Sequence, residues 1–231
     1  MSQDKQSVKD FYDTFTSNQT NIGVSVRHRL ILKKLKSIGL KSHSNVLEIG
    51  CGIGTVSSLI IKNTPSGKFV GCDISPKSIE LARKFNPQKS AEFICTDMSD
   101  FETNLKFDFV VFPDVLEHIP VEEHNQLFER ISRVCKTNAK LLINIPEPNM
   151  LNYQRKNNPH LLQIIDQSLS MQDLLNHTYP HGFQVQSIIP YAIHTNIDNY
   201  LSIVFIRDTE SKPVKLKGKF FQLLQNIKAR F

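Results

Sequence analysis

The sequence of 231 residues lacks tryptophan and is poor in cysteine and glycine, with four cysteines and nine glycines. The cysteines form neither a CxxC pair nor a Cys/His pattern with metal-ligand spacing, which argues against a zinc site and against a disulfide scaffold. No apolar run approaches the roughly 18 residues of a transmembrane helix. The polar amino terminus has no apolar segment of the kind that a secretory signal requires. We therefore expect a reduced, cytoplasmic protein without a bound metal.

Net charge is absent from the body of the chain. The formal net charge is +6, from 28 Lys and Arg against 22 Asp and Glu. Residues 211–231 contain six bases and no acid, so the remainder is balanced at 22 of each. A nucleic-acid-binding domain usually spreads positive charge over one face of its fold. This distribution therefore disfavours nucleic acid as a partner.

The basic tail at residues 211–231 has the pattern of an amphipathic helix, because its apolar residues share one helical face. These residues are Leu216, Phe220, Leu223, Leu224, Ile227 and Phe231. Three interpretations remain open. The tail packs on the protein or on a second subunit of a homodimer, it binds an anionic membrane surface peripherally, or it extends into solvent.

Short apolar runs alternate with amphipathic segments through most of the chain. The runs predict strands at residues 45–50, 68–73, 91–97, 107–114, 140–146, 183–189 and 199–207. The segments at residues 55–63, 76–85 and 121–134 predict helices between them. Continuous apolar runs are typical of strands buried on both faces, and this alternation implies a doubly wound α/β sheet with right-handed crossovers. The last two strands are too close for a crossover helix and should pair antiparallel.

The chain divides into three parts on this pattern. Residues 1–42 are predicted to form a helical cap, because segments 4–16 and 24–39 have helical apolar spacing. Residues 43–210 form the main domain. Residues 146–169 within it are polar and are expected to be a lid-like insertion, after which Ser170 begins another helix. Residues 211–231 form the tail.

A glycine loop follows the first predicted strand and leads into a helix. Gly50, Gly52 and Gly54 give the spacing G-x-G-x-G, whereas a dinucleotide fingerprint requires G-x-G-x-x-G. Glu48 precedes this loop, and Asp73 and Asp97 end the next two strands. In a doubly wound sheet the ligand crevice lies at the carboxyl ends of the strands. Acids there repel a pyrophosphate but suit a cofactor with a cationic centre, ribose hydroxyls and an exocyclic amine.

Four successive segments together resemble a known family. They are VLEIGCGIG, VGCDIS, CTDMSDF and FDFVVFPDVLEHIP, within residues 45–146. They resemble the motifs of class I S-adenosylmethionine-dependent methyltransferases, in particular the branch that acts on small molecules. The resemblance implies a Rossmann-like sheet of seven strands, mostly parallel with an antiparallel last strand. It also implies S-adenosylmethionine as cofactor and S-adenosylhomocysteine as product.

The resemblance assigns a role to each cofactor-binding position. Glu48 with the backbone of Gly50 and Gly52 faces the methionine part, and Asp73 accepts hydrogen bonds from both ribose hydroxyls. Asp97 accepts a hydrogen bond from the adenine amine. The resemblance also places Cys51 and Gly54 in the loop, Ile74 and the Met98 backbone at the adenine ring, and Phe112 and Pro113 beneath the sulfonium.

The fourth segment bears on the methyl acceptor. Enzymes that methylate adenine amines resemble one another in an Asn/Asp-Pro-Pro-aromatic run, which is replaced here by residues 112–115, FPDV. VLEHIP instead resembles the small-metabolite branch. His118 follows the fourth strand and is the best candidate for a general base. The alternative is that Glu117 and His118 only cap the following helix.

Further cationic and titratable residues fall where a substrate wall is expected. The candidates for acceptor binding are Tyr12, Arg27, His28, His160 and His194. An arginine accompanied by imidazoles suits an anionic acceptor, which Arg can hold bidentately. The alternative is that these side chains are solvated or structural.

We therefore expect methylation of an oxygen, carboxylate or hydroxyl, of a small acidic metabolite. Two alternatives remain. One is N-methylation of an amino sugar or another small amine, and the other is a catalytically silent protein that binds S-adenosylmethionine and acts as a regulator or scaffold.

Overall fold

The computed structural model describes residues 6–13, 23–207 and 218. The predicted amphipathic helix of the tail therefore lies outside the described residues, and residues 6–13 are the described part of the first predicted helix. Among the helices of the described segments, none has the length and apolar character needed to span a membrane.

The centre of the molecule is a seven-stranded sheet in the order β3-β2-β1-β4-β5-β7-β6. The strands are β1 Val46–Ile49, β2 Phe69–Asp73, β3 Ala91–Cys95, β4 Phe107–Pro113, β5 Cys135–Pro146, β6 Phe183–Tyr191 and β7 Tyr200–Arg207. The neighbours among β1 to β5 pair parallel, whereas β7 runs antiparallel to both β5 and β6. The predicted Rossmann-like fold class is confirmed, including the antiparallel last strand.

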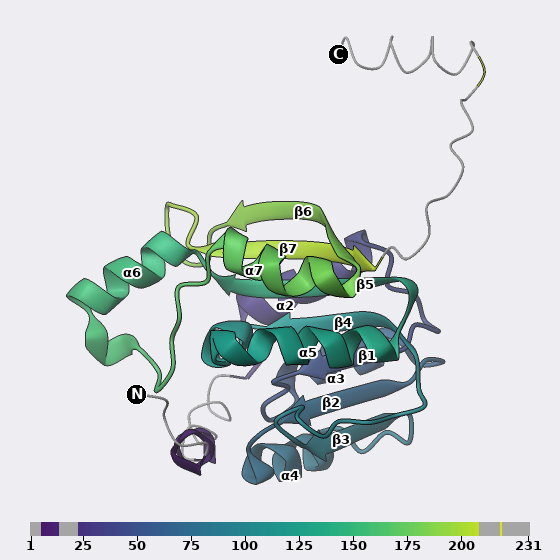
Figure 1. The fold of residues 1–231 in the computed structure, drawn as a ribbon. Helices are drawn as coiled ribbons and strands as arrows, with labels where there is room; N and C mark the ends of the chain where they lie inside the picture. The colour runs from purple at the N-terminus through teal and green to yellow at the C-terminus, as the bar shows by residue number, and fades with distance from the viewer. Residues whose placement is uncertain (1–5, 14–22, 208–217, 219–231) are drawn as a thin grey trace.

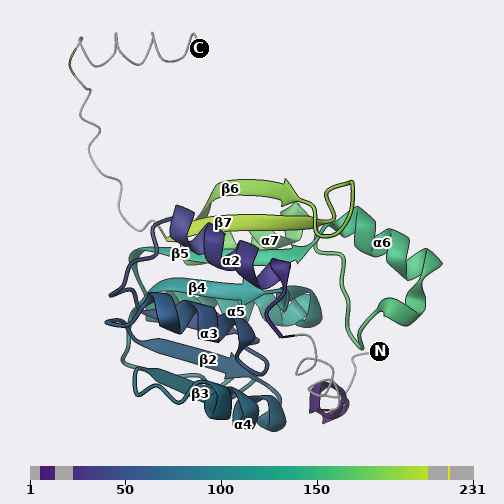
Figure 2. The ribbon, with the colours of Figure 1, turned by 180° about the vertical axis from the view of Figure 1, so that it is seen from behind.

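Helices cover both faces of the sheet. They are α2 Val26–Ser37, α3 Thr55–Asn63, α4 Pro76–Phe85, α5 Val121–Val134, α6 Pro148–Asn157 and α7 Met171–Thr178, with short 3-10 turns η1 Leu116–His118, η2 Pro159–Leu161 and η3 Tyr179–His181. Figure 1 shows α5 and α7 in front of the sheet, and Figure 2 shows α2 and α3 on the opposite face. Ser75 is the N-cap of α4, because its Oγ accepts a hydrogen bond from Ser78 N at 3.0 Å.

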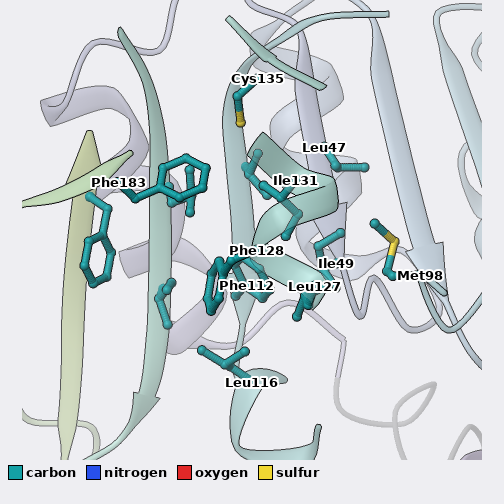
Figure 3. Close-up of a cluster of buried hydrophobic side chains, with 14 of the residues drawn as sticks. Leu47, Ile49, Met98, Phe112, Leu116, Leu127, Phe128, Ile131, Cys135 and Phe183 are labelled. Carbon is teal, nitrogen blue, oxygen red and sulfur yellow. The ribbon is translucent and has the colours of Figure 1, made fainter. Parts of the chain in front are cut away.

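The alternation of side chains along each strand divides the core into two layers. Leu47 and Ile49 of β1 belong to the layer beneath α5, together with Phe112 and Phe128. The rings of Phe112 and Phe128 are 5.9 Å apart, and Figure 3 shows them at the centre of this layer. Phe128 is fully buried, which stabilises the fold by roughly 1.5–3 kcal/mol relative to an exposed side chain. Val46 belongs to the other layer, beneath α2 and α3.

The insertion differs from the sequence-based expectation, which placed no helix between residues 146 and 169. Residues 148–157 form α6, which begins where Glu147 Oε2 accepts a hydrogen bond from Met150 N at 2.8 Å. Leu151 is the one buried side chain of α6. Because a single buried residue creates no apolar periodicity, the sequence pattern does not reveal this helix. In Figure 1, α6 and the helical residues 6–13 both lie beyond the edge at which the parallel strands end.

Candidate functional site

A cavity of about 990 Å³ lies at the carboxyl ends of the parallel strands. Its floor is formed by the ends of β1, β2 and β4 and by the segment after β3, and Tyr200 at the start of β7 reaches it from the side. The helical residues 6–13 contribute Val8 and Tyr12, and the insertion contributes residues 163–167. This volume is within the usual range for small-molecule sites.

The glycine loop after β1 requires its glycines for steric reasons. Gly50 has a φ of 69°, and a Cβ there would lie 2.3 Å from Val115 Cγ2. Gly54 has a φ of 83°, and a Cβ there would lie 2.4 Å from Asn86 Nδ2. Positive φ and close neighbours both select for glycine. The loop therefore brings the backbone of Gly50 and Gly52 to the cavity wall without intervening side chains.

Asp73 fixes the shape of this loop. Its Oδ2 accepts a hydrogen bond from Gly52 N at 2.8 Å, and its Oδ1 accepts one from Ser75 N at 2.9 Å. Burial raises the pKa of Asp73, while the bonds from Ser75 and Gly52 lower it. Asp13 bonds to the hydroxyl of Ser75, so the helical residues 6–13 are attached beside the same carboxylate.

The end of β3 supplies the next part of the wall. Asp97 lines the cavity, and its Oδ1 accepts a hydrogen bond from Ser99 N at 2.8 Å. Met98 has a φ of 69°, and its amide donates to Thr96 Oγ1 at 2.9 Å. Ile74 and Pro113 also line the cavity. The structure thus brings together most of the positions that the sequence nominates for a cofactor.

Glu48 lies away from this wall. Its side chain is fully buried between the sheet and α3, where Oε2 accepts a hydrogen bond from Ser57 Oγ at 2.7 Å. The other oxygen has no hydrogen-bond partner among the described residues. Burial raises the pKa of Glu48 to about 8, against the lowering effect of Ser57. Four of the residues nominated for the cofactor are outside the lining, namely Glu48, Cys51, Gly54 and Phe112. Glu48 faces α3, Cys51 and Phe112 are buried in the core, and Gly54 packs against α4.

An ion pair joins the cap to the end of β4. Arg27 Nη1 lies 2.7 Å from Asp114 Oδ2 and donates to Tyr200 Oη at 3.5 Å. The Asp114 side chain is 7% exposed and that of Arg27 is 37% exposed. Burial raises the pKa of Asp114, and the charge of Arg27 opposes this rise. Arg27 is the one arginine among the described residues that line the cavity.

His118 contacts the insertion through one ring nitrogen. Its Nδ1 lies 2.5 Å from the carbonyl oxygen of Ile165 and 3.1 Å from Asp166 Oδ1. Its Nε2 is 3.9 Å from Glu117 Oε1. Burial lowers the pKa of His118, but the charges of Glu117 and Asp166 outweigh this effect and raise it to about 9.

Gln167 attaches the insertion to the turn that contains His118. Its backbone N donates to Glu117 O at 2.9 Å, and its Nε2 donates to Ile119 O at 2.7 Å. Its Oε1 accepts a hydrogen bond from Val121 N, at the start of α5, at 3.3 Å. Burial raises the pKa of Glu117 to about 8. These contacts hold the insertion over the cavity.

The residues nominated for acceptor binding separate into two groups. Tyr12 and Arg27 line the cavity, and the ring of Tyr12 is 6.2 Å from that of His118. His28, His160 and His194 are outside the lining. His28 instead accepts a hydrogen bond from Ser25 N at 3.1 Å in the cap of α2, and burial followed by the charge of Arg27 lowers its pKa to about 4. His160 and His194 are exposed on the insertion and on the β6–β7 connection.

Sequence reasoning did not nominate several residues that shape this site. They are Asp114, Glu117, Asp166, Gln167 and Tyr200. One feature of the sequence could have identified Asp114, because this residue directly follows a buried strand at the edge of the sheet where ligands bind. Asp166 and Gln167 lie in a polar segment without periodicity, and their contacts with residues 117–121 are not local in the sequence.

Comparisons with known proteins agree with this geometry. Residues 46–138 match a family described as a methyltransferase domain. Malonyl-[acyl-carrier protein] O-methyltransferase of Acetivibrio thermocellus is 35% identical over 71 residues, which cover 31% of this chain and 25% of that protein. Trans-aconitate 2-methyltransferase of Enterobacter sp. is 29% identical over 121 residues, which cover 52% of this chain and 46% of that protein. The chain thus spans about half or less of the length of these relatives.

Solved structures show the same fold. The magnesium protoporphyrin IX methyltransferase of Synechocystis PCC 6803, with bound SAH, has a TM-score of 0.68 at 18% identity, covering 89% of this chain and 100% of that one. The N-methyltransferase NodS of Bradyrhizobium japonicum has a TM-score of 0.59 at 18% identity, covering 79% of this chain and 94% of that one. The domain match and the shared fold lead to one conclusion: residues 46–138 match a methyltransferase domain, and the sheet that contains them has the Rossmann-like fold of these solved methyltransferases.

Proposed function

We propose that the protein transfers a methyl group from S-adenosylmethionine to a carboxylate or hydroxyl oxygen of a small acidic molecule. The observation that carries the proposal is the position of Arg27. Its Nη1 is held by Asp114 and Tyr200, whereas its other guanidinium nitrogens bond to no described residue. A guanidinium anchored at one nitrogen retains donors for a carboxylate. The names of the relatives, which act on malonyl-[acyl-carrier protein] and trans-aconitate, support the same acceptor class.

The cofactor side of the cavity fits S-adenosylmethionine. Asp73 and Asp97 line the cavity at the ends of adjacent strands and would accept hydrogen bonds from the ribose and the adenine amine. The exposed backbone of Gly50 and Gly52 would face the methionine part. The absence of lysine and of a second arginine from the described lining suits a cofactor with a positive charge. When bound, the cofactor supplies an electrophilic methyl group on a sulfonium.

The protein would promote methyl transfer by positioning the two reactants and by excluding water from the cavity. Methyl transfer is fastest when nucleophile and methyl are held in line at about 3–3.5 Å. Arg27 would orient the acceptor from the cap, and Tyr12 and residues 163–167 would close the cavity around it. An acceptor carboxylate is ionised at neutral pH and needs no base. A hydroxyl acceptor would have to lose a proton.

A specific observation favours a second candidate, N-methylation of a small amine. Besides Asp73 and Asp97, the described lining contains five carboxyl groups, those of Asp114, Glu117, Glu122, Glu123 and Asp166. Carboxylates in this number would attract a cationic amine. Arg27 and His118 neutralise Asp114 and Asp166 in part, which is why we place this candidate second.

The test is a methyl-transfer assay with labelled S-adenosylmethionine against two panels of acceptors. One panel contains small carboxylic acids, including trans-aconitate, and the other contains small amines, including glucosamine. We expect product from the acid panel, and lability of the product in base identifies a methyl ester. Product from the amine panel alone would establish the second candidate instead. Turnover with neither panel, in protein that binds S-adenosylhomocysteine, would favour a silent binding protein.

Two arginines of α2 provide a matched control for the role of Arg27. Arg27→Met is expected to raise KM for the acid at least about tenfold, because it removes a charge-assisted contact worth roughly 1.5–3 kcal/mol. Arg29→Met removes the same charge from an exposed position two residues away and should leave KM unchanged. Equal effects of the two substitutions would contradict recognition of the acceptor by Arg27.

A further inference from the structure

The imidazole of His118 is engaged on one side and available on the other. Nδ1 lies 2.5 Å from the carbonyl oxygen of Ile165, and a carbonyl oxygen can only accept, so Nδ1 carries a proton. Nε2 is 3.9 Å from Glu117 Oε1, which is too long for a hydrogen bond. Nε2 makes no hydrogen bond with any described residue, and His118 lines the cavity. Nε2 is therefore the ring nitrogen that remains available for a hydrogen bond to a bound molecule.

Acidic groups surround this ring from each element packed against it. They are Glu117 of η1, Asp166 of the insertion and Asp114 directly after β4. The aromatic ring of Tyr12, from the helical residues 6–13, lies 6.2 Å from the imidazole. The ring itself is 8% exposed. Partly desolvated carboxylates near an imidazole favour its charged form. The pKa of about 9 for His118 agrees with this arrangement.

Asp166 is itself held rigidly. Its Oδ2 accepts a hydrogen bond from Gln163 N at 2.6 Å, while Oδ1 faces His118. Its backbone oxygen accepts a hydrogen bond from Arg155 Nη2 of α6 at 2.6 Å. One oxygen of the carboxylate thus shapes the insertion, and the other orients the ring. His118 thus contacts the insertion through the Asp166 side chain and through the carbonyl oxygen of Ile165.

We propose that Asp166 is a positioning residue that keeps His118 as an imidazolium, with its Nε2–H directed toward an anionic group of the methyl acceptor. This inference rests on the proposed function and deepens it. It gives His118 the role of a cationic hydrogen-bond donor in acceptor binding, in place of the general base that the sequence suggests. Arg27 and His118 would then hold the acceptor from the cap and from the turn after β4.

The two roles of His118 predict opposite responses to pH. A general base must be neutral, so a base role requires kcat to rise as pH passes the pKa of His118. A cationic donor must be protonated, so the proposal requires KM for an acidic acceptor to rise over the same range while kcat changes little. Asp166→Asn removes the charge but retains an oxygen that can accept from Nδ1–H. It should therefore shift this KM transition to lower pH by roughly one unit or more.

The first experiment is an NMR titration of histidine-labelled protein saturated with S-adenosylhomocysteine. His118→Gln assigns the signal. We expect His118 to be protonated at pH 7 in the wild type, to titrate at lower pH in Asp166→Asn, and to recover in Asp166→Glu. Asp198→Asn removes a charge from the exposed β6–β7 connection and should leave the titration unchanged. A neutral ring at pH 7 in the wild type, or equal titration in Asp166→Asn, would overturn the proposal.

The second experiment measures binding of trans-aconitate to the same complexes at pH 6.5 and pH 9.5. Binding should weaken between these pH values in the wild type, and a full pH series should show the same weakening at lower pH in Asp166→Asn. Binding that is independent of pH would overturn the proposal. If no carboxylic acid binds at any pH, the proposed acceptor class fails, and the NMR titration still decides whether Asp166 sets the charge of His118. Thermal unfolding of each variant checks that it is folded.

Discussion

Arg27 Nη1 and Asp114 Oδ2 lie 2.7 Å apart. Arg27, in the first turn of α2, thus neutralises the buried Asp114 directly after β4. The pair fixes α2 to the edge of the sheet at which the cavity lies. Asp114 also has a φ of 56°, a backbone conformation that residues other than glycine seldom adopt. Its charge is opposed by Arg27, and its backbone N donates a hydrogen bond to Asn144 O at 3.1 Å.

Removal of Arg27 should destabilise the fold, because it leaves Asp114 buried without a counter-charge. For Arg27→Met we expect the free energy of unfolding to fall by roughly 1–2 kcal/mol, less than the 3–5 kcal/mol of a fully buried pair because Arg27 is partly exposed. Urea unfolding of Arg27→Met, Asp114→Asn and the double variant gives the coupling energy. Strictly additive effects would show that the pair does not contribute to stability.

Gly50 cannot accept a side chain. A Cβ there would lie 2.3 Å from Val115 Cγ2, and the positive φ adds backbone strain. We expect Gly50→Ala to lower the free energy of unfolding by about 2–4 kcal/mol, from strain and overpacking together. Gly39→Ala is the control for strain alone, because Gly39 also has a positive φ but no atom within 4 Å of its Cβ position. Val115→Ala should recover part of the loss, and equal effects of both alanines would exclude the steric contact.

Asp73 should determine the affinity for the cofactor product. Saturating S-adenosylhomocysteine at about 100 times its dissociation constant should stabilise the wild type by about 2.7 kcal/mol, seen as a rise in Tm. Asp73→Ala removes the acceptor for Gly52 N and the proposed acceptor for the ribose, and should abolish most of this rise. Glu92→Ala removes a charge from an exposed position on β3 and should preserve it. A full rise in Asp73→Ala would refute this role.

Glu48 should make stability depend on pH. Its pKa rises from an ordinary value of 4.5 to about 8 in the folded protein, so the folded state retains a proton that the unfolded state releases. Stability from this group therefore falls as pH increases from about 4.5 to about 8, by a few kcal/mol in order of magnitude. Glu48→Gln should reduce the difference in unfolding free energy between pH 5 and pH 8. Glu117 has the same direction of shift, so part of the difference remains.

Ser57→Ala provides the complementary measurement. The Ser57 hydroxyl donates to Glu48 at 2.7 Å and lowers its pKa. Loss of this bond should raise the pKa of Glu48 further and extend the decline of stability to pH values above 8. An unchanged pH dependence of the unfolding free energy in both variants would show that Glu48 does not titrate in this range.

Patterns along the sequence were sufficient to predict the strands of the sheet but not the residues at which each strand begins and ends. Apolar runs predicted all seven strands. β1 is buried along its whole length, as a continuous apolar run predicts, whereas the edge strands β3 and β6 are partly exposed. β5 begins at Cys135, before its predicted start at Lys140, because the polar residues between them carry no apolar signal. α6 was missed for the same reason, since its exposed faces are polar and one residue is buried.

The candidate site was predictable where its residues follow strands. Asp73, Asp97 and His118 each come after a buried run, and all three line the cavity. Glu48 also belongs to a strand, but it shares the face of Val46, and Ser57 of α3 covers that face. The contact between His118 and Asp166 depends on how residues 147–169 fold back across the sheet edge, and no local pattern encodes that path.

Two different kinds of segment form the two sides of the cavity. The glycine loop and Asp73 belong to the paired strands and their first turns, whereas residues 163–167 belong to a connection that contributes no strand to the sheet. Residues 147–169 can therefore be exchanged for the corresponding connection of another protein of this fold without breaking a strand pairing. Under the proposed function, such a graft between Pro146 and Ser170 would change the preferred methyl acceptor and leave the glycine loop and Asp73 in place, so this one connection is where a new acceptor specificity could be engineered.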